Sequence, residues 1–139
     1  MKSNTLLSSV PYVCAVGASV VVLLFFVASV WIGYEAKNLC QNAVHQYGGS
    51  CKEALIAQLD DTHQSFRAKN AAIWALGQFG DKKALVVLRK YYTGVIPDRE
   101  PLDTVISQYE LQKAIRLVEG GTNITSWLWR GEIGKTFGK

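Results

Sequence analysis

The chain has 139 residues, of which 49% are hydrophobic and 19% are charged. From Glu35 onward, 14 Lys and Arg residues stand against 11 Asp and Glu residues. This excess of three positive charges (14 − 11) is compatible with anionic lipid or an acidic protein partner, but it is too small to indicate a nucleic-acid-binding domain.

One long stretch near the N-terminus has no Asp, Glu, Lys, Arg or His between Lys2 and Glu35. At ~1.5 Å per residue, a helix over residues 12–34 would be ~34 Å long, which is enough to cross a hydrocarbon layer of ~30 Å. The stretch therefore predicts a transmembrane helix over residues 11–34, preceded by a short tail over residues 1–10.

Residues at both ends of this segment suit a membrane helix. Pro11 is expected in the first turn, where a helix tolerates proline, with Ser8 or Ser9 as the cap. Aromatic side chains that prefer the headgroup layers also stand at the two ends: Tyr12, Trp31 and Tyr34.

A cleaved signal peptide is the competing interpretation of this segment. Its apolar core would be ~7 to 15 residues long and would end in small residues. Here the apolar run is much longer and ends in Trp31, Ile32 and Tyr34. We therefore expect an uncleaved, single-pass anchor.

The orientation of the anchor is predicted from cations and cysteines. Near the span, the N-terminal amino group and Lys2 stand on one side and Lys37 stands on the other. This small difference in the number of cations slightly favours a cytoplasmic N-terminus. Cys40 and Cys51 follow the span directly, and two cysteines so placed suggest an oxidising compartment. The C-terminal domain is therefore expected in the periplasm or in a lumen.

The segment over residues 35–49 has few helix breakers and is predicted to extend the membrane helix as a juxtamembrane helix and turn. Gly48 and Gly49 should end it, because glycine adopts the left-handed conformation without a steric penalty. Ser50 and Glu53 then form a capping box, so we expect a new helix to start at Cys51.

The next helix is predicted from about His63 to Phe79, with Asp61 or Thr62 as its N-cap. Small and apolar residues recur at helical spacing and predict a buried face that a neighbouring helix can approach closely. These residues are Ala68, Ala72, Ala75, Leu76 and Phe79.

Gly77 and Gly80 are expected to permit a tight turn, after which Asp81 caps a third helix over residues 82–92. A charged run in the following loop, residues 98–100, is most simply a solvated connection. Ser107 and Glu110 form a second capping box ahead of a helix. The apolar face of that helix consists of Leu111, Ala114, Ile115 and Val118.

Residues 54–56 (Ala-Leu-Ile) recur thirty positions later at residues 84–86 (Ala-Leu-Val), which suggests stacked helix hairpins. Residues 68–88, AKNAAIWALGQFGDKKALVVL, resemble a short HEAT-like repeat of the type named after phycobilisome lyases. The resemblance implies an all-α fold: one N-terminal transmembrane helix followed by a short α-solenoid of antiparallel HEAT-like hairpins over residues 50–121. A C-terminal segment over residues 122–139 follows. The resemblance implies protein contacts and does not imply lyase activity.

The cysteines and histidines suggest a disulfide rather than a metal site. Cys40, His45, Cys51 and His63 have a spacing that fits no zinc pattern. A Cys40–Cys51 disulfide is the candidate. If a straight helix turned back at the two glycines, Cys51 would lie beside Gln46, ~9 Å along the helix from Cys40, so the bond requires a bend or a steep crossing.

Two sets of residues are candidates for contacting a partner. Arg67, Asn70, Trp74 and Gln78 share the helix face opposite the alanines, where Trp74 either belongs to a binding patch or packs against the next hairpin. Trp127 and Trp129 can cover the open end of the stack, enter the headgroup layer or bind a partner. We expect the first of these three, because a short solenoid leaves apolar surface exposed at its end.

The sequence therefore predicts a membrane-anchored interaction scaffold or accessory subunit that binds a membrane-associated protein partner and the lipid bilayer. A supernumerary subunit held mainly by its transmembrane helix is an alternative, and a lyase-like or other enzyme is a second one. No catalytic motif stands out, so we expect no enzyme activity, no cofactor and no metal. We likewise expect no nucleic acid and no small-molecule substrate as a partner.

Overall fold

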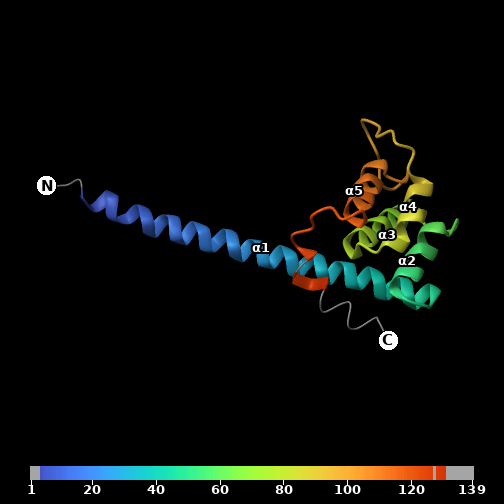
Figure 1. Ribbon diagram of the computed structural model, residues 1–139, viewed down its shortest axis with the longest axis horizontal. Helices are drawn as coiled ribbons and strands as arrows, with labels where there is room; N and C mark the ends of the chain where they lie inside the picture. Colours follow the sequence, from blue (N-terminus) through green and yellow to red (C-terminus); the bar gives the residue numbers. More distant parts are fainter. Residues whose placement is uncertain (1–3, 127, 131–139) are drawn as a thin grey trace.

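The computed structural model describes residues 4–126 and 128–130, and for residues 4–9 only the backbone. In this part of the chain every regular element is helical. Helix α1 (Asn4–Tyr47) is by far the longest and projects from the rest of the molecule as a single rod (Figure 1). Helices α2 to α5 gather around its C-terminal part.

Helix α1 begins earlier than predicted. It starts at Asn4, inside the segment that was expected to be a tail, so Pro11 lies at its eighth position and not in its first turn. Ser8 and Ser9 are therefore helical residues and not caps. From Val10 to Ala28 every side chain is exposed, which makes this part of α1 a long, uncovered apolar rod. It is long and apolar enough to be a membrane span or a signal sequence.

The C-terminal part of α1 belongs to the core of the domain. Its buried residues are small and are spaced by four, three, four and three positions, so they form one stripe along the helix. They are Ser29, Gly33, Ala36, Cys40 and Ala43. Burial thus begins inside the predicted 11–34 span, so the domain packs directly against the end of that segment.

The connection between α1 and helix α2 (Cys51–Asp60) explains how the disulfide forms. Cys40 and Cys51 are bonded, with their Cα atoms 5.2 Å apart. Gly48 and Gly49 have φ values of +71° and +74°, and the three residues up to Ser50 lead the chain back along α1. Three extended residues span ~10 Å, which matches the ~10 Å of helix between Cys40 and Tyr47. Cys51 therefore does not start beside Gln46.

Helix α3 (Phe66–Phe79) starts three residues later than predicted. Its N-cap is Ser65, whose hydroxyl accepts a hydrogen bond from the Ala68 N–H, so neither Asp61 nor Thr62 caps it. Asp61 instead ties the turn to the end of α1, because its carboxylate accepts a hydrogen bond of 2.7 Å from the Tyr47 hydroxyl. The end of α3 agrees with the prediction, with Gly80 as the left-handed C-cap.

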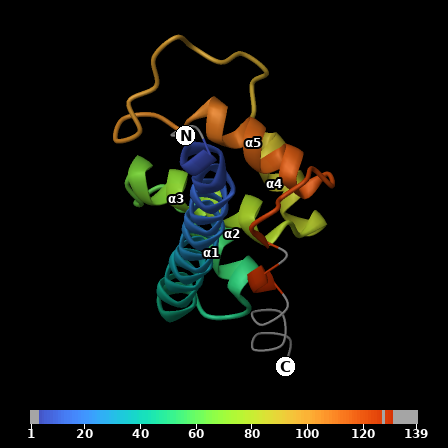
Figure 2. The ribbon, with the colours of Figure 1, turned by 90° about the vertical axis from the view of Figure 1, so that its left-hand side faces the viewer.

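The third predicted helix is divided in two. Asp81 caps a 3-10 turn, η1 (Lys82–Ala84), and helix α4 (Leu85–Tyr91) follows it. Helix α5 (Gln108–Val118) starts after Ser107 as predicted, and all four residues of its predicted apolar face are buried. Figure 2 shows α4 and α5 to one side of α1, with the loop between them projecting at the edge of the domain.

Helix α3 is central, since it packs against α1, α2 and α5. Gly77 allows α5 to approach: a Cβ atom at this position would lie 2.8 Å from the Ala114 Cα atom. Gly77 is therefore a helix contact and not part of a turn. Polar contacts join α2 to α4, where Asp60 accepts hydrogen bonds from Lys90 Nζ (2.9 Å) and the Tyr91 hydroxyl (2.6 Å).

The Gly77 contact gives a test of the helix packing. An exposed helix glycine replaced by alanine stabilises a helix by ~0.5–1 kcal/mol, but here the added methyl overlaps the α5 backbone. We expect Gly77→Ala to lower the free energy of unfolding by ~1–3 kcal/mol, measured by circular dichroism of the full chain in detergent. Gly17→Ala is the control, because nothing lies within 4 Å of that position. A Gly77→Ala variant as stable as the parent would contradict the close α3–α5 contact.

The carboxylates of Asp60 and Asp81 predict acid sensitivity. The hydrogen bond from Tyr91 and that from Lys90 hold the pKa of Asp60 below its ordinary value of 3.8, and Lys52 does the same for the pKa of Asp81. The contribution of these ionised carboxylates to the free energy of unfolding is complete when the pH is above their ordinary pKa. It is lost as the pH falls through their lower pKa values in the folded state. We expect the melting temperature to fall from about pH 5 to about pH 2, and to fall less in Asp60→Asn. Equal slopes for variant and parent would show that Asp60 makes no contribution.

Candidate functional site

The predicted row of exposed residues on α3 is only partly exposed. Arg67 is exposed, but Asn70 retains only 6% of its surface. The Asn70 amide donates hydrogen bonds to the carbonyl oxygens of Leu102 (2.9 Å) and Val105 (2.8 Å), and its oxygen accepts one from the Ser107 N–H (2.9 Å). Asn70 therefore anchors the loop before α5 and is not an exposed member of the row, and its role in partner binding stays a prediction.

The charged run in that loop is also not simply solvated. Glu100 lies at the N-terminus of α5, where its carboxylate accepts hydrogen bonds from the Ser107 hydroxyl (2.7 Å) and from the N–H groups of Gln108 (2.5 Å) and Tyr109 (3.2 Å). Burial raises the pKa of Glu100, but these hydrogen bonds outweigh it and hold the pKa below its usual value. Glu110 pairs with Lys113, and the Ser107 N–H that a capping-box glutamate would take is bonded to the Asn70 oxygen instead.

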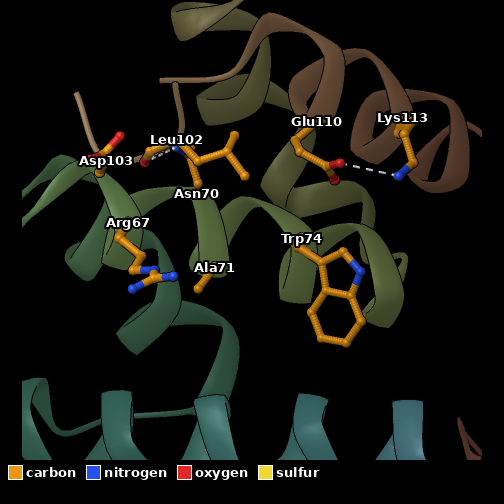
Figure 3. A pocket seen from close by; sticks show the side chains of 8 residues that line it. All are labelled: Arg67, Asn70, Ala71, Trp74, Leu102, Asp103, Glu110 and Lys113. Carbon is orange, nitrogen blue, oxygen red and sulfur yellow. Dashed lines mark hydrogen bonds and ion pairs between the residues drawn. The ribbon is translucent and has the colours of Figure 1, made fainter. Parts of the chain in front are cut away.

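Trp74 is half-buried, packs against the core and lies between two cavities. The larger cavity, about 500 Å³, is lined by side chains of α3, of the loop and of α5 (Figure 3). They are Arg67, Asn70, Ala71, Trp74, Leu102, Asp103, Glu110 and Lys113. Glu110 and Lys113 form an ion pair of 3.1 Å on its far wall. We call this the polar cavity.

The smaller cavity, about 280 Å³, lies between α3 and α1 and has almost no polar lining. Trp74 closes one side of it, and a face of α1 forms the other. The lining residues of α1 are Ala28, Trp31, Ile32 and Glu35. We call this the apolar cavity. Since Trp74 lines both cavities, they adjoin each other at this side chain, and we refer to the two together as the groove around Trp74.

Gln78, the last residue of the predicted row, faces the C-terminal segment of the chain. Its side-chain oxygen accepts a hydrogen bond from the Asn123 amide (2.9 Å), and its main-chain oxygen accepts one from Arg130 Nε (2.9 Å). Burial lowers the pKa of the Arg130 guanidinium. Gln78 thus holds this segment in place and is not a free contact residue.

Trp129 is buried, with 7% of its surface exposed, and its role in partner binding stays a prediction. Its ring meets the Phe79 ring edge to face, with ring centres 5.9 Å apart. It also rests on α1, where a Cβ atom added to Gly33 would lie 2.8 Å from the Trp129 ring. Trp129 therefore covers the junction of α1 and α3. Trp127, the other predicted contact residue, lies outside the described residues.

Among the described residues no group of three or more His, Cys, Asp and Glu side chains is arranged to hold a metal ion. Cys40 and Cys51 are bonded to each other, and His45 and His63 are both exposed. Searches against protein-family models, curated proteins and solved structures found no match to this chain. The groove around Trp74 is therefore interpreted from its own geometry.

The anchoring of the loop by Asn70 can be tested with a matched pair of variants. Asn70 and Arg67 lie one helical turn apart on α3. Asn70→Ala leaves the buried Ser107 N–H and the partly buried carbonyls of Leu102 and Val105 without their partner, at ~1–3 kcal/mol for each unsatisfied group that stays buried. We expect a clear loss of stability and faster proteolysis of the loop. Arg67→Ala should stay within about 0.5 kcal/mol of the parent. Equal stability of the two variants, measured by thermal melting, would contradict the anchoring role of Asn70.

Proposed function

We propose that the chain is a single-pass membrane protein whose small helical domain binds a protein partner at the membrane surface, as a scaffold or accessory subunit. The observation that carries this proposal is the uncovered apolar surface of α1. Val13, Val21 and Leu23, for example, are 62–67% exposed. Soluble monomers rarely leave a contiguous apolar surface of this size in water, whereas a bilayer covers it at no cost.

The packing of the domain supports an anchor over a cleaved signal peptide. Ser29 and Gly33 are buried by the domain, and Gly33 carries the Trp129 ring. Cleavage after residue 34 would remove both residues and expose Trp129. The N-terminus is assigned to the cytoplasm and the domain to the periplasm or a lumen, on the cation and cysteine arguments from the sequence.

The proposal includes a short stack of HEAT-like hairpins, α2 with α3 and α4 with α5. Asn70 contacts Ser107 and Gly77 contacts Ala114, and both pairs are 37 residues apart (107 − 70; 114 − 77), so α3 and α5 run parallel. The Asp60 contacts with α4 join the first helices of the two hairpins. Parallel neighbours of this kind are what a stack of similar hairpins requires. No catalytic step is part of the proposal.

We propose that the partner binds at Trp74 and Arg67. Both side chains line the groove, and unlike Asn70 and Gln78 they do not hold another segment of the chain by hydrogen bonds. A half-buried Trp beside an exposed Arg is the composition that dominates binding hot spots. In the alternative form of the function, the partner binds the membrane span itself. The exposed apolar surface of α1 that supports the membrane anchor supports this alternative as well.

A pull-down from mild detergent separates these two forms of the function. Replacing Arg67 and Trp74 together by Ala should weaken partner binding by ~2 kcal/mol or more, because truncating one hot-spot residue can cost that much. Arg116→Ala is the control, since it removes an exposed cation from α5. Circular dichroism checks that each variant is folded.

A further variant, with poly-leucine over residues 12–28, tests the span. Partners retained by the poly-leucine variant, together with their loss in the double variant, would support the groove. The opposite pattern would move the contact to the membrane helix and contradict the proposed partner surface.

A further inference from the structure

We infer that the groove on either side of Trp74 binds one phospholipid whose headgroup carries both a phosphate and an amine. The inference rests on the proposed membrane anchor and adds a lipid ligand to the same surface. The apolar cavity would take the part of the lipid next to the acyl chains, and the polar cavity would take the headgroup.

The apolar cavity is continuous with the surface that the bilayer covers. Ala28 and Ile32 on its α1 wall lie on the same helix face as Leu24 and Val21, which are 61% and 67% exposed. It is also placed at the end of the span, where Trp31 is 70% exposed and suits the headgroup layer. An acyl chain lying along this face of α1 can therefore reach Trp74 past Ala28 and Ile32, in a cavity that Glu35 also lines.

The polar cavity has charges of both signs. Arg67 and Lys113 contribute two positive charges, and Asp103 and Glu110 contribute two negative charges, so the lining is neutral as a whole. Lys113 and Glu110 pair with each other. Arg67 and Asp103 are both exposed and make no ion pair with the described residues.

An exposed Arg and an exposed Asp on one cavity match a zwitterionic headgroup. The guanidinium recognises phosphate through a fork of N–H donors, and the carboxylate recognises an ammonium group. The Trp74 ring adds a surface over which an ammonium is attracted. A lipid with only a negative headgroup would leave Asp103 opposed by like charge.

The shape of the apolar cavity suits an acyl chain. It is an open, mostly apolar hollow of about 280 Å³ between α1 and α3, into which a thin acyl chain fits.

The test uses the full chain reconstituted in nanodiscs that contain equal amounts of phosphatidylethanolamine and phosphatidylglycerol. After transfer to mild detergent, native mass spectrometry counts the lipids that stay bound to each chain. We expect one retained lipid, with phosphatidylethanolamine enriched about fivefold over the bulk ratio, equivalent to ~1 kcal/mol. Arg67→Ala and Asp103→Ala should each return the ratio toward that of the bulk.

A matched pair of substitutions on α1 tests the apolar end. Ile32→Trp fills the apolar cavity and should abolish retention, whereas Val30→Trp, at the same depth but on another face of the helix and 68% exposed in the parent, should not. Circular dichroism shows whether each variant is folded, and the two exposed positions, Arg67 and Asp103, test the inference even if Ile32→Trp unfolds.

The outcomes distinguish this inference from the proposed function. A chain that does not enter the nanodisc would contradict the membrane anchor itself. An inserted chain that retains lipids in the bulk ratio, unchanged by Ile32→Trp, would overturn the lipid site and leave the anchor. Enriched phosphatidylglycerol would overturn the zwitterionic headgroup, and dimers lost in Ile32→Trp would assign the groove to a second copy of the chain.

Discussion

The contact between the small-residue stripe of α1 and the domain is the constraint on which the rest of the structure depends. Five small residues at alternating spacings of four and three let α2, α3 and the C-terminal segment approach one face of a single helix. A larger side chain at Gly33 would collide with Trp129. The same helix therefore serves as an exposed apolar rod over its first half and as a core element over its second.

The disulfide and the polar contacts reinforce this arrangement at the other end of α1. Cys40 is bonded to the first residue of α2, and the Tyr47 hydroxyl is bonded to Asp61 in the turn before α3. These two links join the end of the long helix to the start of α2 and to the turn before α3. Trp129 links α1 and α3 elsewhere along α1, because its ring contacts Phe79 of α3 and lies against Gly33 of α1.

Local signals in the sequence were sufficient for most helix boundaries. The start of α2 at Cys51, the Asp81 cap and the start of α5 after Ser107 were predicted correctly, because a cap is made by residues three or four positions apart. The start of α3 was wrong, since Asp61 and Ser65 are both capping residues and a contact with Tyr47, 14 residues away, decided between them.

The candidate site was harder to predict because its assignments depend on distant parts of the chain. Asn70 has the spacing of a surface residue, but the loop that covers it comes 32 to 37 residues later. Gln78 is paired with Asn123, 45 residues away. A helical period identifies residues that share a face, and it does not reveal what later packs on that face. The HEAT-like family and the partner surface remain predictions.

The continuity of α1 has a mechanical consequence for the proposed membrane anchor. From Ser29 to Tyr47 the helix extends ~27 Å beyond its fully exposed part, and the domain is fixed to it along that length. If the exposed part spans a bilayer as proposed, a change of ~10° in its tilt would displace the far end of the domain by ~5 Å. Tilting is one way in which a span adapts to the local thickness of the bilayer. Bilayer thickness would then alter the height and direction of the Trp74 groove above the membrane.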